Sequence, residues 1–184
     1  MTRIIAGEWG GRRLAVPKGD STRPTTDRVR EAVFSSLESH FGSLDGLRIL
    51  DAYAGTGALG LEAMSRGAAV TDFVEKDHKA STTLLANIKT LGAVNRGRVH
   101  RTTAAAFVRG SSGDQPLWDV VFLDPPYDVP TSELSELIVA LDPLVSPDGL
   151  FVVERSARSG FSWPDPVEPL REKKYGETQI WYGR

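Results

Sequence analysis

The chain has 184 residues, with 22 basic and 24 acidic side chains and a formal net charge of −2, which suits a single domain with a hydrophobic core of its own. Hydrophobic residues make up 40% of the sequence, and no apolar run reaches transmembrane length, so we expect a cytoplasmic protein with no membrane partner. The absence of cysteine excludes disulfide bridges, thiolate metal sites and the cysteine nucleophile that methylation of pyrimidine C5 ordinarily uses. Because the three histidines lie far apart without ligand spacing, we also expect no metal site.

The first 30 residues are more basic than the rest of the chain. They hold seven basic and three acidic residues in a protein whose total charge is negative. Residues 3–7 and 12–16 each have the composition of a short strand, with glycines between them, which predicts a β-hairpin. Arg3, Arg12 and Arg13 lie on or beside this hairpin. They indicate an anionic partner, although an edge hairpin that uses charge to prevent strand pairing would show the same pattern.

Downstream of the hairpin, the sequence predicts a capped helix and then alternating strands and helices. Thr25 or Thr26 can cap a helix that runs to Phe41, with apolar residues at helical spacing. Short apolar runs then alternate with amphipathic stretches, which is typical of a parallel sheet with helices on both faces. The predicted strands lie near residues 47–51, 70–75, 97–102, 118–123 and 149–154, the helices near 58–66, 77–91, 103–109 and 131–141, and a closing hairpin at 169–174 and 179–182.

A glycine-rich loop follows the first strand of this alternation. Asp51 ends the strand, and Gly55 and Gly57 allow the backbone to approach a ligand closely before a helix begins. With Gly60, the loop also fits the dinucleotide fingerprint, which would indicate a nicotinamide cofactor. In that fingerprint the first glycine lies directly at the strand end, whereas three residues separate Asp51 from Gly55. The spacing therefore favours the loop that binds S-adenosylmethionine in Rossmann-like methyltransferases, with Asp51 suited to the ammonium group of that cofactor.

Two further acidic residues lie at the ends of predicted strands. Glu75 closes the second strand of the alternation, and its carboxylate can accept both ribose hydroxyls of a nucleoside. A carboxylate that stabilises the start of a helix would also explain an acid here, but Asp77 is better placed for that function. Asp124 follows the predicted strand at 118–123. Because ligands of open α/β sheets bind at the carboxyl ends of strands, Asp51, Glu75 and Asp124 should converge on one site.

The tetrapeptide Asp124-Pro125-Pro126-Tyr127 has the groups needed to hold a flat amine. The aspartate and the carbonyl of Pro125 can each accept an N–H of the exocyclic amino group of a nucleobase, and the ring of Tyr127 can stack on the base. The prolines stiffen the turn and donate no hydrogen bond. Two acceptors at the amine draw the nitrogen toward a tetrahedral shape, which frees its lone pair to attack an electrophile. These four residues are the predicted catalytic residues.

Over essentially its whole length, the sequence resembles the RsmD family of bacterial methyltransferases, which act on the guanine N2 amine of small-subunit (16S) ribosomal RNA. The glycine loop and the tetrapeptide are shared by many amino-methyltransferases, and the N-terminal segments narrow the resemblance to this family. The segments that carry it are Arg3 to Gly7, Gly11 to Leu14, Arg23 to Phe34, Asp51 to Gly57, Asp124 to Tyr127 and Tyr175 to Thr178.

The resemblance implies a fold and a division of the chain. The fold would be α/β, a Rossmann-like class I methyltransferase with a mostly parallel seven-stranded sheet and a C-terminal antiparallel hairpin. An N-terminal β-hairpin and helix would be added to it. Residues 1–24 would form an extension that docks RNA through Arg3, Arg12 and Arg13, and residues 25–184 would form the methyltransferase domain.

The resemblance also implies where a cofactor and an RNA bind. The cofactor would be S-adenosylmethionine, and the target guanine would be flipped out of the RNA into the pocket with the tetrapeptide. Many amino-methyltransferases have an aspartate after the third strand for the adenine amino group, whereas this chain has Thr103 near that position. The implied cofactor-binding residues are Asp51, Ala52, Gly55, Gly57, Glu75, Arg23, Thr25 and Thr103.

The implied partner is 16S ribosomal RNA, free or within an assembling small subunit, and we expect the protein to act as a monomer. Three other functions share some of these features. An N6-adenine DNA methyltransferase could use the same loop and tetrapeptide, but it usually carries a separate sequence-reading domain, for which 184 residues leave little room. A non-enzymatic RNA-binding module would leave both motifs unexplained. A protein-glutamine methyltransferase typically has asparagine in place of Asp124.

Overall fold

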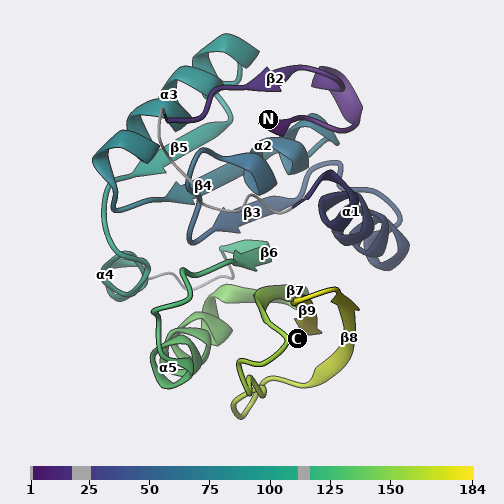
Figure 1. The fold of residues 1–184 in the computed structure, drawn as a ribbon, viewed down its shortest axis with the longest axis vertical. Coiled ribbons are helices and arrows are strands. Elements are labelled where there is room, and N and C mark those ends of the chain that lie inside the picture. The colour runs from purple at the N-terminus through teal and green to yellow at the C-terminus, as the bar shows by residue number, and fades with distance from the viewer. Residues whose placement is uncertain (1, 18–25, 112–116) are drawn as a thin grey trace.

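The computed structural model of the chain describes residues 2–17, 26–111 and 117–184. A seven-stranded sheet forms the centre of the molecule, and a two-stranded hairpin lies outside it (Figure 1). The elements in chain order are β1 (Thr2–Arg3), the 3₁₀ turn η1 (Gly7–Trp9), β2 (Arg13–Leu14), α1 (Asp27–Phe41), β3 (Arg48–Asp51), α2 (Ala58–Ser65), β4 (Val70–Val74), α3 (His78–Leu91), β5 (Gly97–His100), α4 (Ala104–Gly110), β6 (Trp118–Leu123), α5 (Thr131–Leu141), η2 (Asp142–Leu144), β7 (Val145–Ser156), β8 (Pro169–Tyr175) and β9 (Thr178–Gly183).

The main sheet is mostly parallel, with strand order β5-β4-β3-β6-β7-β9-β8. The strands from β5 to β7 in this order are parallel, and β9 runs antiparallel between β7 and β8. This arrangement confirms the predicted parallel sheet with an antiparallel C-terminal hairpin. β7 begins earlier than the predicted strand at 149–154, because Val145 already pairs with Trp118 and an irregularity in β7 takes up the extra residues before the regular register begins.

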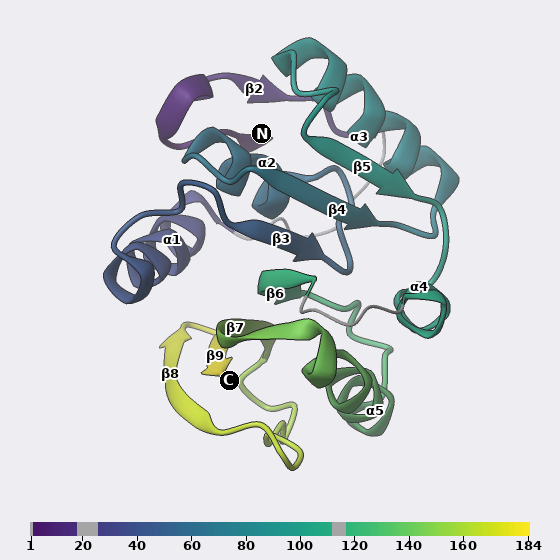
Figure 2. The same ribbon diagram turned by 180° about the vertical axis from the view of Figure 1, so that it is seen from behind.

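Helices cover both faces of the sheet and enclose two hydrophobic layers. On one face, α1 and α2 pack on β3, β6, β7 and β9, around the buried side chains of Phe34 and Phe122. α3 continues this layer over β4. On the other face, α4 and α5 pack around Leu123 and Ile138. Figures 1 and 2 show α1 and α5 on opposite sides of the sheet. Because the helices occupy the two faces, the ends of the strands are where a ligand can reach the sheet.

The N-terminal hairpin is packed on α2 and α3. Ile4 and Trp9 are buried in the same hydrophobic cluster as side chains of these two helices. The carboxylate of Glu62, fully buried in α2, accepts the backbone N–H groups of Ile5 and Ala6 at 2.6 and 3.0 Å. The predicted hairpin is confirmed, although its paired strands are shorter than expected because the chain bends through η1 and buries Trp9. The hairpin therefore shares a core with the sheet domain.

Side-chain caps fix where three of the helices begin. Thr26, Asp77 and Thr103 each accept a backbone N–H from the first turn of α1, α3 and α4, respectively. Of the two caps predicted for α1, Thr26 is the one that makes this contact, and Thr25 lies outside the described residues. Asp77 has the capping position predicted for it, which leaves Glu75 outside the helix.

Candidate active site

The predicted site residues come together at one edge of the main sheet. Asp51 is the last residue of β3, and Glu75, Thr103 and the half-buried Asp124 follow β4, β5 and β6. These strands are neighbours in the order β5-β4-β3-β6. Neighbouring strands lie about 4.8 Å apart, so the four positions form a row about 14 Å across. A ligand with several distinct polar groups can therefore span the row.

Asp51 is buried and holds the glycine loop. Its carboxylate accepts the backbone N–H of Gly60, in the first turn of α2, at 3.0 Å, and also that of Tyr53. Burial raises the pKa of Asp51 to about 7, with the nearby charge of Glu75 adding to the shift and the two N–H groups opposing it. A cation beside the loop would favour the ionised form of Asp51. Ala52 is buried next to it and offers a ligand only its backbone.

The glycines of the loop have three different functions. Gly55 has a φ of 54°, and a Cβ added there would meet no other atom within 4 Å, so the loop presents bare backbone to a ligand. At Gly57, which precedes α2 with a φ of 90°, a Cβ would come within 2.4 Å of Leu84. At Gly60 a Cβ would come within 2.3 Å of Phe73, so this glycine allows α2 to pack on β4. Of the three, Gly55 is the one that opens the loop to a ligand.

Glu75 links the glycine loop to the segment before α3. One carboxylate oxygen accepts the N–H of Gly55 at 2.8 Å, and the other accepts the N–H of Asp77 at 2.6 Å. An ionised carboxylate has about four lone-pair positions, so about two acceptor positions remain for hydroxyl groups of a ligand. The side chain is only half-buried, and a ligand can reach it. Glu75 is thus part of the loop framework and still able to accept further hydrogen bonds.

Thr103 supplies a hydroxyl at the far end of the row. The residue is exposed, and its hydroxyl oxygen accepts the N–H of Ala106 at 3.2 Å as the cap of α4. Capping uses an oxygen lone pair, so the hydroxyl hydrogen remains able to donate. An aspartate at this position would accept from an adenine amino group, whereas a threonine can also donate to a ring nitrogen of adenine.

In the proline-containing turn after β6, the two proline carbonyls differ in their hydrogen bonds to the described residues. The carbonyl of Pro126 accepts the N–H of Val129 at 3.1 Å and Nη1 of Arg155 at 3.3 Å. The carbonyl of Pro125 accepts no hydrogen bond from any residue that the structure describes. Tyr127 is 74% exposed, so its ring is open to a stacking partner. Pro125 itself is buried, so within the described residues the turn combines a buried residue whose carbonyl has no hydrogen-bond partner with an exposed aromatic ring.

Two residues of the site were not predicted from the sequence. Arg155 is buried near the end of β7 and holds the turn after β6. Asn87, on α3, donates to the carbonyl of Thr56 in the glycine loop at 3.0 Å and pairs with both backbone polar groups of Ala15. Asn87 lies on the apolar face of α3, where a polar residue is a signal that it has a specific partner. Arg155 follows the predicted strand at 149–154 and carries no such signal.

The three arginines predicted to bind RNA lie on the N-terminal hairpin, away from the row of strand ends. A backbone N–H of the hairpin turn donates to Oγ of Ser65, the last residue of α2, at 3.0 Å. α2 has eight residues and begins at the glycine loop, so the turn lies about 12 Å from that loop along the helix. Arg12 and Arg13 are exposed, whereas Arg3 pairs with Asp27 at 3.0 Å.

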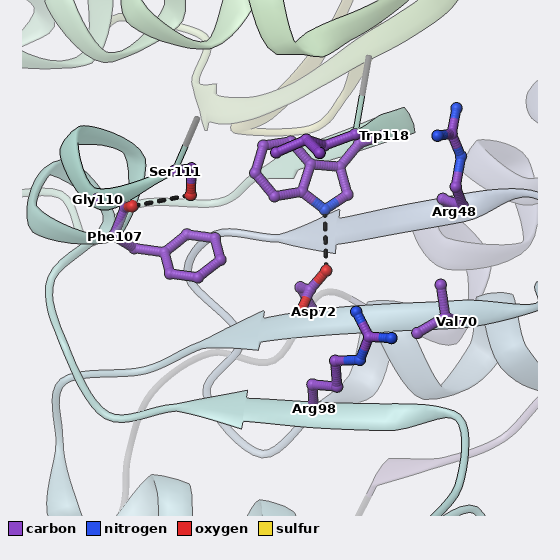
Figure 3. A pocket seen from close by; sticks show the side chains of 9 residues that line it. Arg48, Val70, Asp72, Arg98, Phe107, Gly110, Ser111 and Trp118 are labelled. Atoms are coloured by element: carbon purple, nitrogen blue, oxygen red, sulfur yellow. Dashed lines mark hydrogen bonds between the residues drawn. The ribbon is translucent and has the colours of Figure 1, made fainter. Parts of the chain in front are cut away.

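A pocket of about 450 Å³ lies between α4 and the sheet, apart from the row of strand ends (Figure 3). Asp72, Phe107 and Trp118 are among the residues that line it. Both carboxylate oxygens of Asp72 are engaged, one with the indole N–H of Trp118 at 3.0 Å and the other with His100 at 2.8 Å. None of the predicted site residues that the structure describes lines this pocket. Asp72, on β4, is bonded to residues of β5 and β6.

Within residues 2–17, 26–111 and 117–184, no group of histidine, aspartate and glutamate side chains is arranged to hold a metal ion. In the same ranges, no helix is both long enough and apolar enough to cross a membrane. Two of the predicted cofactor-binding residues, Arg23 and Thr25, lie outside the described ranges.

Comparison with known proteins finds similar proteins over nearly the whole chain. A family model described as conserved hypothetical protein 95 matches residues 2–184. The ribosomal RNA small subunit methyltransferase D of Escherichia coli K12 is 37% identical over 181 residues, which cover 96% of this chain and 86% of that protein. A putative rRNA methyltransferase of Bacillus subtilis, YlbH, is 36% identical over 183 residues, which cover 97% of this chain and 96% of YlbH. The solved structure of a putative methyltransferase of Escherichia coli, yhhF, has a TM-score of 0.85 at 36% identity and covers 100% of this chain and 97% of its own.

We predict that Asp51 makes the protein less stable as pH rises from about 4 to about 7. In the unfolded chain Asp51 ionises near its ordinary pKa of about 3.9, whereas burial raises the pKa to about 7 in the folded protein. Over this interval the folded state keeps a proton that the unfolded state has released, so the free energy of unfolding falls as pH rises. Above pH 7 both states are ionised and the effect is complete.

Urea unfolding of the wild-type protein and Asp51→Asn across this pH range measures the effect. The difference between their free energies of unfolding should change with pH, with the wild type losing stability relative to the variant. Asp148→Asn, at an exposed aspartate, is the matched control and should follow the wild type at each pH. A pH-independent difference between the wild type and Asp51→Asn would show that the buried carboxyl group is not protonated in the folded protein.

Proposed function

The chain belongs to the ribosomal RNA small subunit methyltransferase D family, the conserved hypothetical protein 95 family, and we propose that it methylates the N2 amine of a guanine in 16S ribosomal RNA with S-adenosylmethionine. The observation that supports this most is the position of the turn after β6. The Pro125 carbonyl, which has no hydrogen-bond partner among the described residues, and the exposed Tyr127 lie one strand away from the glycine loop. A base held by the turn and a methyl donor held by the loop would therefore be neighbours.

The residues at the strand ends fit S-adenosylmethionine. The open space at Gly55 lets a ligand lie against the backbone of the loop, and Glu75 keeps acceptor positions for two ribose hydroxyls. The carboxylate of Asp51 would favour binding of the ammonium group of the cofactor, and Thr103 would contact the adenine at the far end of the row. When bound, this cofactor supplies an electrophilic methyl group on a sulfonium. The chain supplies the shape and the charges that place the acceptor nitrogen against it.

The turn after β6 would act on the guanine amine. Asp124 and the carbonyl of Pro125 accept its two N–H groups, so the nitrogen loses conjugation with the ring and its lone pair points away from both acceptors. Tyr127 stacks on the flipped base and fixes its plane. As the new N–C bond forms, positive charge develops on the nitrogen, and the carboxylate of Asp124 stabilises it. The proton that the nitrogen loses afterwards goes to Asp124 or to water, so no strong base is needed.

The site needs a way to hold the rest of the RNA, and the N-terminal hairpin would supply it. The net positive charge of the first 30 residues and the exposure of Arg12 and Arg13 support a phosphate-binding function for residues 1–24, with residues 25–184 carrying the catalytic site. The hairpin turn lies about one length of α2 from the glycine loop, so the RNA would have to extend over the surface of that helix. The reaction would take place in the cytoplasm, on 16S RNA or on an assembling subunit, with the protein acting as a monomer.

The most direct test of the function uses 16S ribosomal RNA lacking its natural methyl groups, incubated with the protein and S-adenosylmethionine. Mass spectrometry of the digested nucleosides should show new N2-methylguanosine. N6-methyladenosine in place of it would overturn the guanine assignment and favour adenine as the target. The appearance of no methylated nucleoside, with RNA and with assembled subunits alike, would contradict methyl transfer to this RNA.

We predict that Asp124→Ala lowers the rate of methyl transfer by about 100-fold or more, because it removes a charged acceptor at the developing positive charge. Tyr127→Phe should retain most of the activity, whereas Tyr127→Ala should weaken RNA binding by about 1–3 kcal/mol through the loss of stacking. Single-turnover rates and RNA affinity measure both effects. Asp128→Ala, at the exposed neighbouring residue, is the control and should act like the wild type. Equal damage from Tyr127→Phe and Tyr127→Ala would show that the hydroxyl matters and not the ring.

We predict that Glu75→Ala weakens the binding of S-adenosylmethionine by about 1.5–3 kcal/mol, because charge-assisted hydrogen bonds to the ribose and to the loop are lost. Calorimetric titration gives the affinity. Asp77→Ala is the matched control, since it removes a nearby carboxylate and costs about 1 kcal/mol of helix capping while leaving cofactor affinity unchanged. An affinity of Glu75→Ala equal to that of the wild type would remove Glu75 from the cofactor site.

We predict that the double variant Arg12→Ala/Arg13→Ala binds the RNA more weakly, with a salt dependence flatter by about one unit of slope for each lost phosphate contact. Cofactor affinity should not change. RNA binding at several salt concentrations measures this, and Arg98→Ala/Arg101→Ala provides a matched double variant at exposed arginines after the start of β5. If only the second variant lost affinity and slope, the RNA would bind along β5 and the hairpin would not be a docking element.

A further inference from the structure

Arg155 connects the end of β7 with the turn that follows β6. Its Nη1 donates to the carbonyl of Pro126 at 3.3 Å, and its Nη2 donates to the carbonyl of Val129 at 2.8 Å. Only 8% of the residue is exposed. One planar guanidinium therefore binds the carbonyls at both ends of a short stretch of the turn. Two donors from one rigid group define the orientation of this stretch better than a single hydrogen bond would.

Among the residues that the structure describes, the charge of Arg155 has no carboxylate partner. Among the residues in the described ranges, no acidic side chain lies within ion-pair distance of its guanidinium, and its Nε makes no hydrogen bond. A buried cation is costly unless its surroundings compensate for it, and here the compensation comes from two carbonyl dipoles of the turn. Arginine at this position is therefore explained by what it does to the turn and not by an ion pair.

The proline rings pass this constraint to the acceptor carbonyl. They fix φ at Pro125 and Pro126, and a residue that precedes a proline is also restricted in ψ, so little rotation remains between the two carbonyl groups. Once Arg155 holds the carbonyl of Pro126, the direction of the Pro125 carbonyl follows. That carbonyl accepts no hydrogen bond from the described residues, and it is the acceptor that the proposed function assigns to the amine.

The charge of Arg155 also reaches the glycine loop. Tyr53, in that loop, is half-buried, and the opposite charges of Glu133 and Arg155 both act on its hydroxyl. Tyr53 is thus within electrostatic reach of both Glu133, in the first turn of α5, and Arg155. Arg155 therefore holds the turn after β6 through hydrogen bonds and acts on the glycine loop through its charge.

We propose that Arg155 is a positioning residue for methyl transfer. Through its hydrogen bonds to the carbonyls of Pro126 and Val129, it sets the direction of the Pro125 carbonyl and the position of Asp124 relative to the target amine. It touches neither substrate nor cofactor. The proposal rests on the proposed function, because a turn held in this way matters for the rate only if the turn holds the reacting base. A small misplacement of reacting groups can lower a rate by about 100-fold.

The test compares the wild type with Arg155→Met and Arg155→Lys in single-turnover methyl transfer to 16S RNA, with saturating cofactor and at a temperature where all three are folded. Arg155→Met should lower the single-turnover rate constant by about 10- to 100-fold with S-adenosylmethionine affinity within about twofold of the wild type. Arg155→Lys should recover part of this loss, because an ammonium reaches one of the two carbonyls. Millimolar methylguanidinium should raise the rate of Arg155→Ala but not that of the wild type. Arg158→Met, an exposed arginine three residues further on, is the matched control and should keep the wild-type rate.

Amide hydrogen exchange provides a readout that does not depend on methyl transfer. The N–H of Val129 donates to the carbonyl of Pro126 and should exchange faster in Arg155→Met than in the wild type, whereas amides of α3 should not change. A wild-type single-turnover rate constant in Arg155→Met, or unchanged exchange at Val129, would overturn the proposal. If the wild-type protein itself transferred no methyl group, the proposed function would fail, and faster exchange at Val129 would still show that Arg155 holds the turn.

Discussion

The site depends on the parallel register of β4, β3 and β6. Backbone hydrogen bonds between these segments continue past the end of β3 into the glycine loop. Ala52 donates to the carbonyl of Phe122 at 3.1 Å, and Ala54 donates to the carbonyl of Val74 at 3.0 Å. The glycine loop is thereby joined to both neighbouring strands and cannot shift along the sheet by itself. Each polar side chain at the strand ends then has a fixed position, along the strand direction, relative to the next one. A loose loop at any of these strands would separate the groups that must act together.

The carboxylates at this edge hold the backbone and remain able to bind a ligand. Asp51 accepts N–H groups from the glycine loop and from α2, and Glu75 accepts one N–H from the glycine loop and one from the segment before α3. Burial of Asp51 raises its pKa to about 7, so its ionised form is costly in the free protein. A ligand cation would offset that cost, and binding would then be coupled to loss of a proton. Arg155, on β7, is similar in that its buried charge is compensated by backbone groups, here the carbonyls of the turn after β6.

Much of the fold could be predicted because its signals are local. The apolar run at 47–51 and the capped helix at 77–91 correspond closely to β3 and α3, and the convergence of Asp51 and Glu75 followed from their places at strand ends. The contact between Arg155 and the turn after β6 could not be predicted, since it joins backbone carbonyls to a side chain 26 or more residues away and has no periodic pattern. For the same reason, sequence patterns gave the hairpin but not the burial of its tryptophan against α2 and α3.

If methyl donor and acceptor meet at the carboxyl ends of β3, β4 and β6, a crystal structure with S-adenosylhomocysteine should show it. We expect electron density for the ribose beside Glu75, the amino-acid end near Asp51, and the sulfur facing the turn at Asp124. Density for the nucleoside elsewhere, such as in the pocket beside Trp118, would contradict it. So would a bound cofactor whose sulfur pointed away from Asp124, because the chain would then hold a methyl donor without bringing it to the amine.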